Sequence, residues 1–444
     1  MNDRPNIILV VADDIGFCNL GCYGSHTVKT PVLDRMASEG LRFTNAYCGG
    51  AVCAPSRAVL MTGNHQGHAS VRGNPGGLAL LEEDVTVASL LKQADYTCGG
   101  FGKWGLGDVR TAGVPEQHGF DEFFGYYHQI HAHTYYPEFL WRNSVRIQIE
   151  GNHDEMPPER GQQYSHDLIF EESVRFIRKN SNRPFFAYLP WTLPHGPLVI
   201  PPDEALYAQY QNQPWPEEDK LCATMISMFD RDVGRLLKVV TELAIEENTL
   251  LLVTSDHGAS CRHDEGIQSC GNLRGQKGTL YEGGIRTPLI ARMPGTLTAG
   301  ETPAHLCYSA DVLPTLCELA GIDPPPDTDG LSLVPTFLGE TTEQPQATHE
   351  YLYWEEHPYN FGRGCYRPDA MLQALRRGNW KLVRPDQQSP PQLFNIASDP
   401  GEQYDLAGRE PYVLDQLLSL LEQARTEPPP QDEPMQEEGQ RYRR

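Results

Sequence analysis

The chain has 444 residues, of which 39% are hydrophobic and 9% aromatic, so it can bury a substantial core as a globular protein. Its length fits one large α/β domain with a smaller companion. The formal net charge of −23 repels nucleic acid and anionic membranes, and we expect neither as a partner. No apolar run reaches the ~20 residues of a membrane span. No leader pattern precedes the apolar residues 6–12, which predicts a cytoplasmic protein unless an export signal was removed.

Short, β-branched apolar runs recur along the first two thirds of the chain. They lie at residues 6–12, 96–101, 184–189, 249–254 and 288–292. Stretches with the spacing of amphipathic helices lie at residues 32–39, 85–94, 167–179, 221–242 and 311–319. Strands that alternate with helices predict an α/β fold, a doubly wound and mostly parallel sheet with helices on both faces.

After residue 340 the composition changes. A polar linker at 341–348 leads to short strand-like segments at 371–375 and 380–383 and to a helix near 412–424. We therefore expect one large domain over residues 1–340 and a small antiparallel sheet with one helix over 341–426. The tail at 427–444 is rich in Pro, Gln and Glu, which predicts disorder.

Charged or ligating side chains follow four of the predicted strands. In chain order these are Asp13 and Asp14, Lys103, His195, and Asp256 with His257. The carboxyl ends of parallel strands meet at one edge of a sheet, where ligands bind. A single acidic residue there is more often a helix cap, but four segments together weaken that interpretation. The carboxylates suit Ca²⁺ or Mg²⁺, whereas the imidazole leaves room for a softer metal.

The segment from Cys53 to Gly63 has the pattern of a short helix. Pro55 suits the first turn and Gly63 suits the end. Cys53 would then lie at the helix N-terminus, where the dipole favours an anion, with Arg57 one turn further on. These features indicate a thiol in an electropositive pocket, either a thiolate nucleophile or a buried structural cysteine.

The same segment, Cys53-Ala54-Pro55-Ser56-Arg57 followed by Thr62-Gly63, resembles the signature of type I, formylglycine-dependent sulfatases. Further motifs follow in that family's order: Gly102-Lys103-Trp104, Pro194-His195-Gly196-Pro197, Ser255-Asp256-His257-Gly258, residues 274–288, Trp380-Lys381-Leu382 and residues 393–402. The likeness covers nearly the whole chain. It implies the alkaline phosphatase-like fold and calcium-dependent hydrolysis of a sulfate ester.

The resemblance also implies roles for individual residues. Cys53 would be oxidised to Cα-formylglycine by a formylglycine-generating enzyme or an anaerobic maturase, a transient partner. One hydroxyl of the hydrated aldehyde attacks sulfur, and the other later expels sulfate. The metal ligands, with Ca²⁺ preferred to Mg²⁺, look like Asp13, Asp14, the modified Cys53, Asp256 and His257. Arg57, Lys103 and Lys277 would surround the sulfate, and His195 would donate a proton to the leaving alcohol.

Two positions depart from the family's pattern. Gly105 stands where the family commonly has a His that serves the formylglycine hydrate, so either another base takes over or turnover is impaired. His128, His131 and His133 follow soon after, and one of them could fold back into this place. His257 stands where many members have Asn, which bears on metal preference more than on the reaction.

Residues 119–143 are rich in aromatic and hydrogen-bonding groups, which suit a sugar, an aromatic leaving group or simple packing. The stretch resembles members that act on 4-sulfated galactose or N-acetylgalactosamine. The candidate residues for binding a sulfated glycan or small molecule are His131, His133, Arg142, Arg262 and His263. The last two could equally belong to a solvated loop. Two other functions stay open: a phosphonate monoester or phosphodiester hydrolase of the same superfamily, and a non-catalytic sulfated-glycan binder, which only Gly105 supports.

Overall fold

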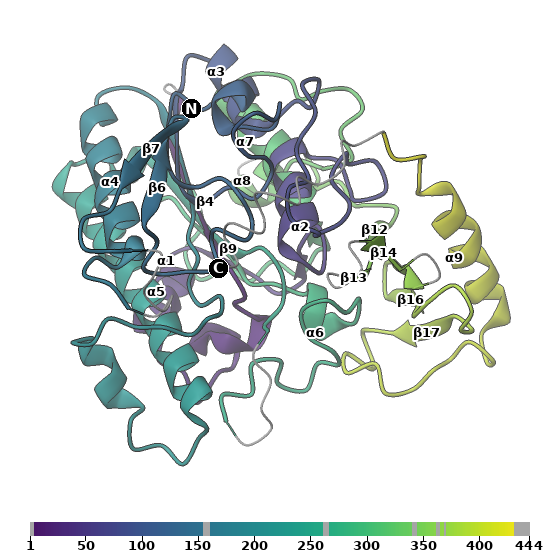
Figure 1. Cartoon of the computed structure of the whole chain (residues 1–444). Coiled ribbons are helices and arrows are strands. Elements are labelled where there is room, and N and C mark those ends of the chain that lie inside the picture. The colour runs from purple at the N-terminus through teal and green to yellow at the C-terminus, as the bar shows by residue number, and fades with distance from the viewer. Residues whose placement is uncertain are drawn as a thin grey trace.

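The computed structural model describes residues 4–153, 160–260, 266–339, 344–360, 365–367 and 370–429. A nine-stranded sheet forms the centre of the described part, in the order β2-β10-β9-β1-β8-β4-β5-β6-β7 (Figure 1). Its strands are β1 (Asn6–Ala12), β2 (Leu41–Phe43), β4 (Thr97–Lys103), β5 (Glu122–Tyr126), β6 (Phe139–Arg142), β7 (Val145–Gln148), β8 (Phe185–Pro190), β9 (Thr249–Ser255) and β10 (Leu289–Arg292). The five central strands, from β9 to β5, are parallel, and the strands at both edges are antiparallel.

Helices cover both faces of this sheet. They are α1 (Pro31–Glu39), α2 (Cys53–Thr62), α3 (Val87–Gln93), α4 (Ser165–Asn180), α5 (Glu217–Glu242), α6 (Glu282–Ile285), α7 (Val312–Ala320) and α8 (Val334–Leu338). Along β1, Ile8 and Val10 pack into the core under α1, α4 and α5, whereas Ile7 and Leu9 pack under α2, α3, α7 and α8. A strand buried on both faces explains the continuous apolar run. The predicted doubly wound α/β fold is confirmed. Within the described residues, no helix combines the length and apolar character needed to cross a bilayer.

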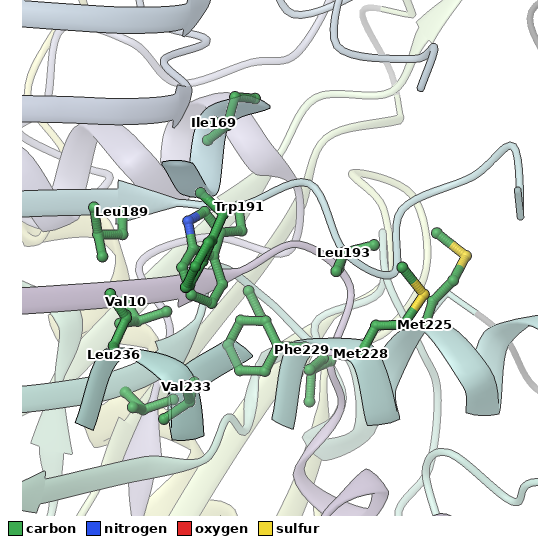
Figure 2. Packing of buried hydrophobic residues seen from close by; sticks show 14 of the residues in the cluster. Val10, Ile169, Leu189, Trp191, Leu193, Met225, Met228, Phe229, Val233 and Leu236 are labelled. Carbon is green, nitrogen blue, oxygen red and sulfur yellow. The ribbon is translucent and has the colours of Figure 1, made fainter. Parts of the chain in front are cut away.

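Trp191 anchors the segment that follows β8. Its side chain is fully buried, and Figure 2 shows the ring beside Leu189 and Val10 of the sheet and Phe229 of α5. The Trp191 and Phe229 rings lie edge to face, with centroids 5.5 Å apart. Because Trp191 lies only four residues before His195, this packing fixes the start of the loop that carries His195 to the sheet edge.

A second, four-stranded antiparallel sheet lies beside the large one, with α9 (Pro411–Gln423) on its outer face (Figure 1). Its strands, in sheet order, are β12 (Leu352–Glu356), β15 (Leu372–Arg377), β16 (Trp380–Arg384) and β17 (Gln392–Asn395). Two short pairs complete the strands, β3 (Ala46–Tyr47) with β11 (Cys307–Tyr308) and β13 (Tyr359–Asn360) with β14 (Cys365–Tyr366). The expected small antiparallel sheet with one helix is confirmed. The boundary at 340 and most of the predicted tail, from residue 430, lie outside the described residues.

Two segments differ from expectation. The run at 288–292 was expected among the strands of the parallel sheet, yet β10 is antiparallel to β9. The Gly258 backbone N–H donates to the Gly284 carbonyl, so the chain is again at the carboxyl edge shortly before β10, and that strand can only run back from it. Residues 119–143, expected as a possible sugar-facing surface, include β5 and β6, whose aromatic side chains are mostly buried.

Candidate active site

The polar side chains predicted from separate strand ends meet at the carboxyl edge of the large sheet. Asp13 directly follows β1, Lys103 ends β4, and Asp256 directly follows β9. Lys103 Nζ lies 2.6 Å from Asp13 Oδ2, and both side chains are fully buried. Burial would raise the pKa of Asp13, but Lys103, His195, Arg57 and Lys277 lower it well below its usual range. The edge therefore holds a buried carboxylate surrounded by cationic groups.

Cys53 opens α2, as the sequence predicts, and Gly63 ends the helix in the left-handed conformation at φ 71°. Cys53 Sγ lies 3.3 Å from His257 Nε2 and 3.6 Å from Asp13 Oδ1. Burial and Asp13 would raise the pKa of the thiol, yet Lys103, Lys277 and His257 lower it well below its usual range. The head of α2 is thus an electropositive pocket that favours an anionic side chain at residue 53.

Arg57 joins three of the converging segments. Its Nε and Nη2 donate to Asp256 Oδ2 at 3.2 and 2.8 Å, and its Nη1 donates to the Lys103 carbonyl at 2.8 Å. The guanidinium is fully buried and therefore fixes α2 against the ends of β4 and β9.

Asp14 reaches the same pocket as Asp13 because the backbone leaves the extended conformation. Successive side chains of a strand point to opposite faces, but Asp14 has φ 78°, in the left-handed region. Its Oδ1 accepts a hydrogen bond from Lys277 Nζ at 2.7 Å. Burial alone would raise the pKa of Asp14, and Lys277, His195 and His257 lower it below its usual range.

The donor set fits a divalent cation. Ligand atoms lie within 4.8 Å of one another in two overlapping groups, one of Asp13, Cys53, Asp256 and His257 and one of Asp13, Asp14 and His195. His257 Nδ1–H donates to the Gly258 carbonyl at 3.0 Å, so Nε2 is the ring atom that faces the carboxylates. Burial would lower the pKa of this imidazole, but Asp256 and Cys53 raise it to about 9, and a bound cation would take the place of the proton on Nε2. Burial and Asp13 raise the pKa of Asp256 to about 6, the crowding of carboxylates that a bound cation relieves.

His195 belongs to this cluster, and His133 lies beside it. His195 Nδ1–H donates to the Gly196 carbonyl at 2.5 Å, so its Nε2 is the atom left for chemistry. The His133 ring stacks on His195, with centroids 4.5 Å apart and planes 17° apart. Burial and His195 lower the pKa of His133, which keeps that imidazole neutral. His133 is therefore the predicted substrate residue that the structure brings to the pocket.

The other predicted substrate residues lie elsewhere. His131 is buried between the aromatic rings of Tyr126 and Phe139, at centroid distances of 5.0 and 4.5 Å, as expected of a core residue. Arg142 forms an ion pair at 3.2 Å with Glu122, the first residue of β5, so it lies toward the opposite end of that strand from the pocket. Arg262 and His263 lie outside the described residues.

Two buried residues near the pocket escaped the sequence analysis. Gln129 lies against Gly105, and the missing side chain at residue 105 was its only signal. Glu356 belongs to β12 of the small sheet, and no pattern singled it out. Burial raises the pKa of Glu356 to about 8, and the charges of His257 and Cys53 also act on it. The small sheet thus adds a neutral carboxyl to the surroundings of the pocket.

Comparisons with known proteins agree with this arrangement. A family model described as Sulfatase matches residues 5–322, and one described as N-sulphoglucosamine sulphohydrolase, C-terminal, matches residues 275–427. Arylsulfatase A of Homo sapiens is 32% identical over 462 residues, which cover 94% of this chain and 87% of that protein. N-acetylgalactosamine-6-sulfatase of Homo sapiens is 30% identical over 465 residues, which cover 94% of this chain and 85% of that protein.

Solved structures share the whole architecture. The crystal structure of Ps i-CgsB in complex with k-i-k-neocarrahexaose has a TM-score of 0.82 at 27% identity and covers 99% of this chain and 97% of that one. The phosphonate monoester hydrolase of Agrobacterium radiobacter shares the fold, with a TM-score of 0.70 at 22% identity, covering 95% of this chain and 96% of that one. With the Sulfatase model matched over most of its length, this chain belongs to the sulfatase family of sulfuric ester hydrolases.

Proposed function

We propose that the chain hydrolyses a sulfate monoester on a carbohydrate, with residue 53 as the nucleophile after its conversion to Cα-formylglycine. One observation carries the proposal. Cys53 Sγ, which marks where the reactive atom of the modified residue would stand, lies 3.3 Å from His257 Nε2 and 3.6 Å from Asp13 Oδ1. A nucleophile at the head of a helix, beside a ligand cluster for a cation, suits attack on an anionic ester.

Asp13, Asp14, Asp256 and His257 would hold the cation, and their carboxylate oxygens suit Ca²⁺ and Mg²⁺ alike. The resemblance to the sulfatase family is what favours Ca²⁺. When bound, the ion supplies Lewis-acid stabilisation of negative charge on oxygen. Residue 53 and oxygens of the substrate's sulfate would complete its coordination.

The cationic side chains divide into two kinds. Arg57 and Lys103 are fully buried and already paired with Asp256 and Asp13, so they mainly offset carboxylate charge and fix the geometry. The Lys277 side chain is 21% exposed, and we assign it to meet the incoming sulfate. Fixed cations in a buried site stabilise developing negative charge without reorganisation.

His195 would deliver the proton to the leaving alcohol. Its Nδ1–H is held by the Gly196 carbonyl, which leaves Nε2 as the donor once the ring is protonated. The stacked His133 ring keeps His195 in this orientation and offers a neutral imidazole to the sugar.

The carbohydrate substrate class is supported by the names of the relatives. One is an N-acetylgalactosamine-6-sulfatase, and the crystallised Ps i-CgsB is bound to an oligosaccharide. The resemblance of residues 119–143 implies a 4-sulfate on galactose or N-acetylgalactosamine, whereas the named relative acts on a 6-sulfate. A panel of 4- and 6-sulfated galactose and N-acetylgalactosamine, with matched phosphate esters, measures both position and reaction class. We expect release of sulfate from at least one sugar; hydrolysis restricted to phosphate esters, or to simple aryl sulfates, would contradict the proposal.

Maturation is tested on the protein itself. The chain is produced in a host that has a formylglycine-generating enzyme or an anaerobic maturase. We expect the mass of the peptide that contains residue 53 to fall by the mass difference between the CH₂SH group and an aldehyde group. Sulfate-releasing activity should rise in proportion to the converted fraction. Activity in fully unconverted protein would rule out the aldehyde as the nucleophile.

A further inference from the structure

Gln129 is a buried amide without a hydrogen-bond partner. Its side chain is 4% exposed, and neither Oε1 nor Nε2 has a partner among the residues that the structure describes. Gln66 is equally buried, yet its Nε2 donates to the Arg72 carbonyl at 3.0 Å and its Oε1 accepts from the Glu355 backbone N–H at 3.1 Å. An unpaired buried amide costs about 1–3 kcal/mol, so packing alone does not account for a Gln at position 129.

The backbone brings Gln129 over Gly105. Beyond the paired strands β4 and β5, the Trp104 N–H donates to the Tyr126 carbonyl at 2.8 Å and the Gly105 N–H donates to the Tyr127 carbonyl at 3.0 Å. These bonds hold the two loops side by side just past Lys103, where the site begins. Gln129, two residues beyond Tyr127, therefore lies against Gly105, and Gly105 in turn lies beside Arg57 of the site.

Gly105 leaves the space that the Gln129 amide fills. A Cβ atom on residue 105 would lie 2.5 Å from Gln129 Oε1 and 3.7 Å from Arg57 Cδ. Gly105 also has φ 74°, in the region that favours glycine. The two residues are thus matched, because the Gln129 amide would have to move to make room for a side chain at position 105.

We propose that Gln129 is a sulfate-binding residue of this active site, whose amide takes the place of a residue-105 side chain and donates a hydrogen bond to an oxygen of the bound sulfate group. The inference rests on the proposed function. Next to it, the Arg57 guanidinium already makes three hydrogen bonds, to Asp256 and to the Lys103 carbonyl, and the Gln129 amide would add an unused donor beside it.

The chemistry of an amide has a consequence for the reaction. A carboxamide does not titrate between pH 4 and 10 and cannot take up a proton, so Gln129 can orient and stabilise an anion but cannot act as a base. An imidazole placed in the same space would titrate near neutral pH. The pH dependence of turnover therefore distinguishes the two groups.

The test compares Gln129→Met with Gln66→Met, because Met fills a similar volume without hydrogen bonding. The dissociation constant of inorganic sulfate is measured by calorimetry on Ca²⁺-loaded protein carrying Cys53→Ala, and kcat/KM for 4-nitrophenyl sulfate on the matured enzyme. We expect Gln129→Met to weaken sulfate binding by roughly tenfold, the worth of one hydrogen bond, with an unchanged or higher Tm. Gln66→Met should lower Tm and leave sulfate binding unchanged.

A double-mutant cycle on residues 105 and 129 tests whether the two side chains act on sulfate binding through their contact with each other. Gly105→Ala should sharply reduce sulfate binding in the wild-type background and have a smaller effect when Gln129 is Ala, because the clash is then absent while the backbone strain is the same. In addition, Gly105→His with Gln129→Gly should introduce a new titrating group into the pH profile. Unchanged sulfate affinity and kcat/KM in Gln129→Met, from an enzyme that hydrolyses sulfate esters, would overturn the inference. A wild-type enzyme that hydrolyses no sulfate ester would instead overturn the proposed function.

Discussion

Two regions of the molecule bury clusters of charge in different ways. Where the small sheet meets the large domain, Lys381 Nζ lies 3.0 Å from Glu282 Oε1 and 2.8 Å from Glu402 Oε1. The Glu282 backbone N–H donates to Glu402 Oε2 at 2.7 Å, and the Tyr47 hydroxyl donates to Glu282 Oε2 at 2.6 Å. This network ties α6 to β16.

The pocket at the head of α2 is built differently. Its carboxylates face one another as well as the cations, and its rim carries Gln129 and Glu356, each with a polar atom that has no hydrogen-bond partner in the described part of the chain. Buried charge is therefore a poor marker of a functional site by itself. Ligand atoms of four residues within 4.8 Å of one another distinguish the pocket from the network, in which two carboxylates contact one lysine.

The largest effect we expect is a loss of turnover without a loss of stability, from a substitution at residue 53. Cys53→Ala removes the precursor of the nucleophile and should lower turnover of sulfate esters by more than about 10⁴-fold, with Tm nearly unchanged. Rate and thermal unfolding are measured on the same preparation. Residual turnover within tenfold of wild type would show that residue 53 is not the nucleophile.

In the network around Lys381 we expect the opposite result, a loss of stability without a loss of turnover. Lys381→Met removes the cation that Glu282 and Glu402 share and leaves Glu282 with only the longer contact to Arg286, so we expect a loss of about 3–5 kcal/mol in the free energy of unfolding. Turnover per folded molecule should stay close to wild type, because Lys381 does not contact the pocket cluster. Adding Glu282→Gln should recover part of the stability, as urea unfolding would show. Loss of turnover at full stability would place Lys381 in the site instead.

The two regions also differ in how far they could be predicted from the sequence. The segments around Glu282, Lys381 and Glu402 were recognised as family motifs without a role, and only their meeting in space shows a structural tie. Asp13 and Asp256 were predictable as neighbours because both follow parallel strands, and strand ends meet at one edge. The position of Gln129 beside Gly105 was not predictable. It depends on how the loops after β4 and β5 pair with each other, and no local sequence pattern indicates that pairing. Likewise, Glu356 comes from a sheet whose docking involves contacts far apart in sequence.

Calcium should stabilise the pocket and leave the network unaffected. At a Ca²⁺ concentration about 100 times its dissociation constant, binding to the folded state adds about 2.7 kcal/mol to the free energy of unfolding. We expect chelation to abolish turnover and lower Tm, and Ca²⁺ to restore both. Asp14→Asn should lose most of the Tm increase, whereas Lys381→Met should keep it. An equal increase in Asp14→Asn would place the ion elsewhere.

The smallest expected effect concerns Glu356, whose pKa burial raises from an ordinary 4.5 to about 8. Between these pH values the folded protein retains a proton that the unfolded chain has lost, so stability falls as pH rises. In calcium-free protein, Glu356→Gln removes this penalty, and its Tm advantage over wild type should grow from pH 5 to pH 8. The exposed Glu350 provides the control, since Glu350→Gln should show no such trend. A Tm difference independent of pH would contradict the assignment.

The most direct test of the proposed calcium site is the anomalous diffraction of crystals soaked in Ca²⁺. We expect one peak among Asp13, Asp14, Asp256 and His257, beside residue 53, and none between Glu282 and Glu402. A peak in the network, or a pocket that stays without an ion at saturating Ca²⁺, would contradict it.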